Sequence, residues 1–384
     1  MSGGVDSSVA AALLKKQGYG VVGVHMRCYN VDGCAEQDAE DARRTAEILG
    51  IPFYVFDFEK EYKEKVVEYM IDGYRRGLTP NPDVECNREI KFGLFLKKAL
   101  EMGADYVATG HYVRIRSSAN SESITNKRIA NKKFVNSKEI RYSLMIARDL
   151  NKDQSYFLWT LTQEQLKYCL FPIGEYKKPE VRRLARRFGL LNADKKDSQG
   201  ICFLGKVTFR GFLKDYIPEK KGLVLTTAGE KIGEHRGAAF YTIGQRHLGI
   251  RNMELGIRGK DTQPHYVIEK DVKKNTLVVA EGSDNPAFYR KEILLHDLNL
   301  IRPMIHDSKF MIPVYVRVRY RQPLVKARIM NYELGITDRS TKAKIHDSKF
   351  MILKFDQPVK FVAPGQSAVF YSKSGEMLGG GVIV

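Results

Sequence analysis

The first half of the chain alternates between two patterns of hydrophobic and polar positions. Apolar residues recur with the 3.6-residue spacing of a helix in four stretches, residues 7–17, 36–49, 61–76 and 89–102. Short apolar runs of strand length lie beside them, at residues 21–26, 53–58 and 106–109. This alternation predicts an α/β fold whose N-terminal domain is a parallel sheet covered by helices.

The pattern changes along the second half of the chain. Residues 163–190 have helical spacing again, but from Gly222 onward short strands and turn residues replace the helices. We therefore predict a small β-rich central domain followed by a C-terminal β-barrel. The expected domains are residues 1–206, 207–275 and 276–384.

Two stretches fall outside these patterns. Residues 117–141 are rich in Ser, Asn and Lys and have no period, which predicts a surface insertion. The octapeptide IHDSKFMI occurs at Ile305–Ile312 and again at Ile345–Ile352, with unrelated flanks. We interpret it as a duplicated or inserted fragment; both copies could be strands, and neither is assigned a function.

Composition narrows the class of protein. The chain has 384 residues, 43% hydrophobic and 28% charged, with no apolar run near the roughly 20 residues that span a bilayer. It shows no secretory signal pattern, so we expect a cytoplasmic protein with no membrane partner. The net charge of +18 favours a polyanionic partner such as nucleic acid, although a generally basic, solvated surface would give the same number. Five widely spaced cysteines predict a reducing compartment and thiols used for catalysis or metal binding.

The chain opens with MSGGVDSS, a glycine-rich turn directly before an apolar helix. Glycines let backbone N–H groups approach an anion closely, and a helix N-terminus favours negative charge. The segment Ser2–Ser8 therefore predicts a phosphate-binding loop, without the lysine of a Walker A sequence. It resembles the pyrophosphate loop of the PP-loop ATPases, which cleave ATP between the α- and β-phosphates. A buried strand precedes that loop in the superfamily and is missing here. We expect a start codon that is placed too late, and loss of the first strand is the alternative.

Two cysteines lie in motifs that suit thiol chemistry. Cys86 follows TPNPDVE, whose two prolines predict a stiff loop before a helix starting near Glu89. A thiol at a helix N-terminus can have its pKa lowered, so we interpret Cys86 as reactive rather than as a buried, inert cysteine. Cys202 lies in DSQGICFLG, where glycines on both sides predict an adaptable loop.

Basic residues alternate in VRVRYR, residues 316–321. A strand here would place Arg317, Arg319 and Arg321 on one face and Tyr320 on the other. Such a face could follow the phosphates of a nucleic acid, and a solvated edge strand is an alternative of equal weight.

Six motifs occur in order along the chain: SGGVDSS, NPDVECN, ATGHY, NKDQSYFLW, DSQGICF and PGQSAVFY. Together they resemble the tRNA-specific 2-thiouridylases, the MnmA family of the PP-loop ATPase superfamily. The resemblance implies a sulfurtransferase that uses ATP to adenylate the C2 oxygen of the wobble uridine of tRNA and then replaces that oxygen with persulfide sulfur. It also implies Mg²⁺ as the counter-ion of ATP, a persulfide sulfur-donor protein as a partner, and no resident metal.

The resemblance also implies roles for individual residues. Cys202 would carry the persulfide, Cys86 would free its terminal sulfur and leave a Cys86–Cys202 disulfide, and Asp83 would act as a general base. The residues expected to bind ATP are Ser2, Gly3, Gly4, Val5, Asp6, Ser7, Ser8, Met26 and Gly110. The residues expected to contact tRNA are Asn81, Pro82, Asp83, His111, Lys152, Asp153, Gln154, Arg319, Tyr320 and Gln366. For His111 the alternative is a core histidine that closes a strand.

Three other functions remain open at this point. A PP-loop synthetase acting on a small molecule would need neither the two cysteines nor the basic β-rich half. An iron–sulfur cluster held by Asp83, Cys86 and Cys202 would support tRNA thiolation differently, although the chain has no Cys-x-x-Cys pair. A non-catalytic tRNA-binding protein would follow if the opening loop did not hold ATP.

Overall fold

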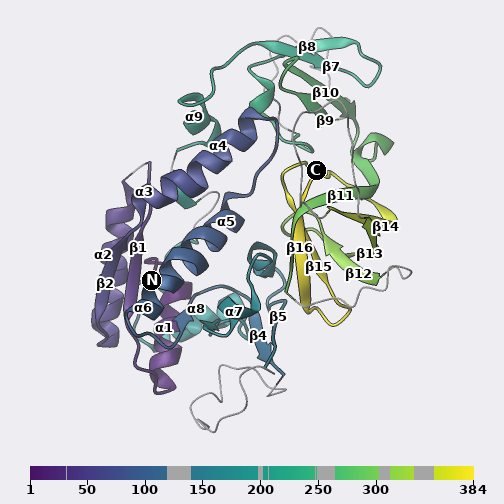
Figure 1. The fold of residues 1–384 in the computed structure, drawn as a ribbon. Coiled ribbons are helices and arrows are strands. Elements are labelled where there is room, and N and C mark those ends of the chain that lie inside the picture. Colours follow the sequence, from purple (N-terminus) through teal and green to yellow (C-terminus); the bar gives the residue numbers. More distant parts are fainter. Residues whose placement is uncertain are drawn as a thin grey trace.

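The computed structural model describes residues 1–31, 33–118, 140–197, 202–205, 207–246, 248, 264–301, 312–332 and 350–384. Of Cys202 it describes the backbone alone. Figure 1 shows three parts: a helix-rich N-terminal part, a small sheet that contains β7 to β10, and a C-terminal barrel of strands β11 to β16. In the described residues no helix has the length and apolar character needed to cross a membrane.

The N-terminal part alternates helices with short strands. Its first elements are α1 (Val5–Lys16), β1 (Gly23–Arg27), α2 (Cys34–Leu49), β2 (Phe53–Asp57), and a helical run of α3 (Glu59–Tyr62), a π-helical segment (Lys63–Val67) and α4 (Glu68–Arg75). A second run follows, made of α5 (Pro82–Glu85), a π-helical segment (Cys86–Phe95) and α6 (Leu96–Glu101). The remaining elements are β3 (Val107–Ala108), β4 (Arg114–Ser117), β5 (Tyr142–Met145), α7 (Gln163–Leu166), β6 (Cys169–Leu170), α8 (Lys178–Arg187) and α9 (Phe209–Lys214).

The predicted parallel pairing of the N-terminal strands is confirmed. Strand β1 pairs in parallel with β2, and β3 pairs in parallel with β6, as two separate two-stranded sheets. Met1 lies beside β1, where its amino group donates to the Val24 carbonyl and its own carbonyl is 3.1 Å from His25 Nδ1. The phosphate-loop candidate therefore starts at the edge of the β1–β2 pair.

Two sequence predictions about this part need correction, and a third is left untested. The helix expected from Glu89 begins at Pro82, because the Asn81 side chain caps it by accepting from the backbone N–H groups of Asp83 and Val84. Residues 163–190 are not one helix, since strand β6 lies between α7 and α8. Residues 117–141 lie mostly outside the described residues, and the hairpin β4–β5, which the sequence did not predict, flanks them.

The second half is β-rich, as predicted. The central sheet has the strand order β8–β7–β10–β9, formed by β7 (Gly222–Leu225), β8 (Lys231–His235), β9 (His265–Asp271) and β10 (Thr276–Glu281). Strand β10 belongs to this sheet, so the structure extends the central unit past the expected end at residue 275. The closed barrel consists of β11 (Tyr289–Leu300), β12 (Ile312–Arg317), β13 (Val325–Tyr332), β14 (Phe350–Lys360), β15 (Ser367–Tyr371) and β16 (Met377–Ile383). Most of both IHDSKFMI copies lies outside the described residues; the first ends at the start of β12 and the second at the start of β14.

A buried ion pair joins the barrel to the N-terminal part. Asp153 is 1% exposed, and its Oδ2 accepts from Arg317 Nη1 at 2.8 Å and from Ser155 Oγ at 3.0 Å. Its Oδ1 accepts from the backbone N–H groups of Ala147 and Ser155. The same Ser155 hydroxyl lies 2.9 Å from the hydroxyl of Tyr371 in the barrel. A buried charge is tolerated when it is paired and hydrogen-bonded in this way, so the pair fixes where the barrel docks.

We expect Asp153→Asn to lower the free energy of unfolding by about 3–5 kcal/mol, because it leaves the buried Arg317 cation without its anion. The double variant Asp153→Leu, Arg317→Met should lose less unfolding free energy than Asp153→Asn, since neither buried charge remains. Chemical denaturation measures both, with Asp194→Asn as the control because Asp194 forms an exposed pair with Arg186. A double variant that loses as much stability as Asp153→Asn would contradict this account.

Candidate functional site

The opening loop folds as a tight turn onto the start of α1. Gly3 has φ +69°, and a Cβ there would collide with the backbone of Asp38, so the position needs glycine. The hydroxyls of Ser7 and Ser8 donate to the Gly4 carbonyl at 3.2 and 2.9 Å. The loop thus brings backbone N–H groups and hydroxyls together at a helix N-terminus, the arrangement that binds phosphate.

Three cations from distant parts of the chain meet two carboxylates beside this loop. Lys178 Nζ is 2.8 Å from Asp6 in the loop and 2.7 Å from Asp197. Asp197 is also 2.6 Å from Lys152 Nζ and 3.0 Å from Arg182 Nη2. Burial acts to raise the pKa of Asp197, but the hydrogen bonds of Lys152 and Lys178 outweigh it and lower that pKa to about 2. The carboxylate is therefore ionised throughout the physiological range.

Sequence analysis missed this cluster. The loop carries no lysine of its own, and the cations come from positions 152, 178 and 182, which only the fold brings to residue 6. Asp197 opens the DSQGICF motif, and that was the one available signal. Asn192 was missed as well: it is 6% exposed, and its amide group donates to the Gly3 carbonyl and to Ser8 Oγ.

The segment Thr109–His111 lies between the loop and the helix that carries Cys86. A Cβ on Gly110 would come within 2.6 Å of Ser7 N, so Gly110 packs directly against the first turn of α1. The ring of His111 is 6.0 Å from that of Phe92, in the helical run that contains Cys86, and Thr109 Oγ1 is 2.7 Å from His111 Nδ1. These contacts place the two halves of the candidate site next to each other.

His111 itself is 8% exposed, between Phe92 and Phe171. Burial lowers its pKa well below the usual value, and repulsion from Lys91 adds to this, so the imidazole is neutral. This burial is the one expected for the core histidine named as the alternative, and the contact of His111 with tRNA stays a prediction.

Asp83 and Cys86 lie one helical turn apart in the run that starts at Pro82. Burial raises the pKa of Asp83, with an opposing effect of Lys91, and this favours proton uptake by the carboxylate. Cys86 is 4% exposed, so the expectation that a loop presents it in polar surroundings is wrong. It begins a π-helical segment, a rare form that is found most often at functional sites.

Cys202 begins a short 3-10 turn, Cys202–Leu204. The following residue, Phe203, packs against Tyr62 and Phe212 in the same hydrophobic cluster as Cys86. The distance between the two thiols lies outside the described residues, and their meeting remains a prediction.

The barrel residues expected to contact tRNA lie beside the Cys86 helix. The Tyr320 ring is 4.5 Å from that of Phe157, whose carbonyl accepts from Asn87 at 3.0 Å. Gln366 Nε2 donates to the Thr79 carbonyl at 2.7 Å, just before Asn81 and Pro82. These contacts hold the barrel against the loop that leads to Cys86.

The expected arginine face is wrong. Strand β12 ends at Arg317, which is buried against Asp153, while Arg319 is exposed in the following turn. Arg321 has φ +65° and lies over the Tyr320 ring, so the three arginines do not share one strand face. The alternation in the sequence continues past the point where the strand stops.

The first polar residues of the motif NKDQSYFLW make contacts inside the protein. Asp153 is buried, Gln154 Oε1 accepts from the Tyr112 backbone N–H at 2.9 Å, and Lys152 forms a salt bridge with Asp197. The tRNA contact of Asp153 stays a prediction. Met26, expected at the adenosine, is half-buried in β1 against the cluster that contains Cys86.

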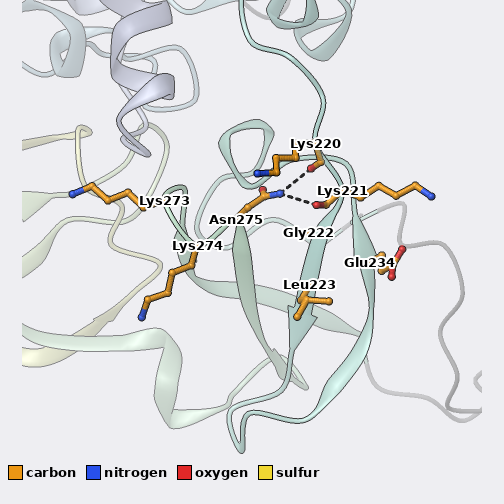
Figure 2. Close-up of a pocket in the computed structure, with 8 residues that line it drawn as sticks. All are labelled: Lys220, Lys221, Gly222, Leu223, Glu234, Lys273, Lys274 and Asn275. Atoms are coloured by element: carbon orange, nitrogen blue, oxygen red, sulfur yellow. Dashed lines mark hydrogen bonds between the residues drawn. The ribbon is translucent and has the colours of Figure 1, made fainter.

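A lysine-lined hollow of about 220 Å³ lies in the central sheet. Figure 2 shows Asn275, which donates to the carbonyls of Lys220 and Lys221, with lysine side chains spread around it. Lys273 and Lys274 complete the group. The hollow lies at the opposite end of the molecule from α1 (Figure 1), so it is separate from the phosphate-loop candidate.

We expect Gly110→Ala to displace the opening loop, because the new Cβ would meet backbone atoms of Asp6 and Ser7. Overpacking of this kind costs about 1–3 kcal/mol. The rise in thermal midpoint that ATP produces should shrink in the variant. Gly20→Ala is the control, since nothing lies within 4 Å of its Cβ position. Equal ATP-induced shifts in the two variants would rule out this role of Gly110.

The buried His111 predicts a loss of stability in acid. Its folded-state pKa lies below the usual 6.5, so below about pH 6.5 the unfolded chain takes up a proton that the folded chain does not. Wild type should therefore lose stability relative to His111→Gln as the pH falls from about 6.5 toward 5, by up to about 1.4 kcal/mol per pH unit. Denaturation midpoints across this range provide the measurement, and parallel pH curves would disprove it.

Comparison with known proteins gives matches along the whole chain. Family models match as "tRNA methyl transferase HUP domain" at residues 1–206, "tRNA methyl transferase PRC-barrel domain" at 210–281 and "Aminomethyltransferase beta-barrel domain" at 290–383. A relative from Geobacillus kaustophilus, named tRNA-specific 2-thiouridylase MnmA 1, is 44% identical over 97% of this chain and 90% of its own length. Relatives from Bacillus pumilus and Streptococcus mutans, named tRNA-specific 2-thiouridylase MnmA, are 42% and 40% identical, each over 100% of this chain and 93% of its own length.

Identity of this degree over nearly the whole of both partners, together with the six ordered motifs and the loop geometry, is enough to assign the chain. It belongs to the family of tRNA-specific 2-thiouridylases.

Proposed function

We propose that the chain catalyses ATP-dependent 2-thiolation of the wobble uridine of tRNA. The observation that carries the proposal is the Thr109–His111 segment, which packs against the phosphate-loop candidate on one side and the Cys86 helix on the other. In the proposal the nucleotide site would lie beside a thiol and a carboxylate of raised pKa, and these contacts support it. The names of the full-length relatives supply the reaction and the substrate.

The opening loop would bind the phosphates of ATP, with Mg²⁺ as counter-ion. The C2 oxygen of uridine would attack the α-phosphate, forming an adenylated base and releasing pyrophosphate. The loop's N–H groups and hydroxyls, with the nearby cations, would stabilise the charge that develops on the leaving group. Asp83 would hold the proton that moves during the reaction.

Sulfur would arrive as a persulfide on Cys202, supplied by a donor protein. Attack of the Cys86 thiolate on the inner sulfur of that persulfide would release hydrosulfide and form a Cys86–Cys202 disulfide. The hydrosulfide would add at C2, and AMP would leave with the original oxygen. A two-electron thiol reductant would then restore both cysteines.

The domain descriptions name methyl transfer, whereas the full-length relatives are named for thiolation. We favour thiolation because it uses both the nucleotide loop and the two cysteines. A small-molecule synthetase leaves the cysteines and the barrel contacts at Tyr320 and Gln366 without a purpose. In the residues whose side chains are described, no group of three potential metal ligands is present, a set that excludes Cys202.

The test incubates the full chain with ATP, Mg²⁺, a persulfide donor and unmodified tRNA, followed by mass analysis of the anticodon nucleosides. We expect 2-thiouridine at the wobble position, and Cys86→Ser and Cys202→Ser should each lower its yield by roughly a thousandfold or more. Both variants should still release pyrophosphate when tRNA is present, because adenylation precedes sulfur transfer.

Cys28→Ser is the matched control and should retain thiolation, since Cys28 has no role in the proposed relay. Thiolated product from the Cys86→Ser, Cys202→Ser double variant would refute the relay. Tight tRNA binding without any ATP cleavage would instead leave a non-catalytic tRNA-binding protein.

A further inference from the structure

Lys152, Lys178 and Arg182 converge on one carboxylate, that of Asp197, beside the opening loop. We propose that these three side chains bind the pyrophosphate portion of ATP, and that Asp197 is an internal stand-in for phosphate oxygens while the nucleotide is absent. The inference rests on the proposed function, because it concerns how the same nucleotide site recognises its ligand.

The salt bridges of this cluster join three cations to two carboxylates, Asp6 and Asp197, among the described residues. A third carboxylate, that of Asp149, accepts from the backbone N–H of Lys178 at 2.8 Å. Asp197 alone accepts from three cationic groups within 3.0 Å. A polyanion with several charged oxygens would satisfy the same donors more completely.

The three cations differ in how firmly the protein holds them. Arg182 also donates to the carbonyls of Ala193 and Lys195, at 2.6 and 3.0 Å, so its guanidinium is fixed. The Lys178 side chain is 10% exposed and is bound to Asp6 as well as to Asp197. Lys152 is 30% exposed, and within the part of the chain that the structure describes its one salt bridge is to Asp197. Lys152 can therefore transfer from Asp197 to a phosphate without disturbing the fold.

Asn192, a buried side-chain amide at the loop, has an acceptor atom without a hydrogen bond among the described residues. Asn192 is 94% buried and donates to Gly3 and Ser8, but its Oδ1 has no hydrogen-bond partner within the part of the chain that the structure describes. An orphaned buried acceptor is costly. The Oδ1 atom of Asn192 therefore fits a loop whose hydrogen bonds are completed only when a hydrated ligand is bound.

Isothermal titration with inorganic pyrophosphate and, separately, with AMP tests the proposal on the full chain at fixed ionic strength. Lys152→Gln should weaken pyrophosphate binding roughly tenfold, the effect of losing one hydrogen bond from a charged group. Asp197→Asn should tighten it about threefold, since the internal competitor has lost its charge. AMP binding should change by less than about twofold in Lys152→Gln, because AMP lacks the pyrophosphate.

Matched controls come from exposed pairs of the same types. Lys167→Gln removes a lysine paired with Glu164, and Asp194→Asn removes a carboxylate paired with Arg186 on the same helix as Arg182. Both should bind pyrophosphate like wild type. Circular dichroism and the thermal midpoint of each variant establish that it is folded before its affinity is compared.

Two outcomes would overturn the inference. Weaker pyrophosphate binding in a folded Asp197→Asn would make Asp197 a structural anchor rather than a competitor. Unchanged pyrophosphate affinity in Lys152→Gln, together with weaker tRNA binding, would show that Lys152 binds tRNA and not pyrophosphate. Nucleoside analysis with the same proteins distinguishes failure of this inference from failure of the proposed function. Thiolation by the wild type, with pyrophosphate affinities unaltered in the variants, would contradict only the inference. The expected affinities without any thiolation by the wild type would contradict only the proposed function.

Discussion

The buried carboxylate of Asp153 is the constraint on which the arrangement of the molecule depends. A charge that is 1% exposed must be fully paired, and its partners come from its own turn and from Arg317 of the barrel. The barrel therefore has one docking position. That position sets Tyr320 against Phe157 and Gln366 against Thr79, beside the helix that carries Asp83 and Cys86. The side of the candidate site that carries Asp83 and Cys86 is thus built by domain docking as much as by local sequence.

A second set of charges organises the nucleotide side. Lys152, Lys178 and Arg182 lie far from the opening loop in sequence, yet they reach Asp6 and Asp197 within 3.0 Å. Asp197 pairs with Lys178, which also binds Asp6 in the loop, and it opens the motif DSQGICF that contains Cys202. The proposed phosphate site and the proposed sulfur-carrying segment therefore share one residue. The Thr109–His111 segment completes the connection, because Gly110 contacts the loop and His111 contacts the Cys86 helix.

The motif NKDQSYFLW illustrates why motif position alone does not give a residue's role. The resemblance implies tRNA contacts for Lys152, Asp153 and Gln154, and these stay predictions, while the structure shows that side chains of the motif contact the barrel. Asp153 binds Arg317, and Trp159 Nε1 donates to Ser367 Oγ in β15. A motif at a domain interface and a motif at a binding surface are equally polar in sequence. What distinguishes them is burial, which depends on which other element covers them.

Local signals in the sequence determined the elements and their order. Helical and strand spacing gave α1, β1, α2 and β2 nearly to their ends, and the glycines of the opening loop gave the phosphate turn, because these depend on neighbours a few residues away. Tertiary structure alone decided that the thiol of Cys86 is buried, that Arg317 pairs inward while Arg319 stays exposed, and that a distant lysine, Lys178, reaches a loop that has no lysine of its own. Each of those outcomes depends on contacts between residues distant in the chain, and periodicity carries no information about such contacts.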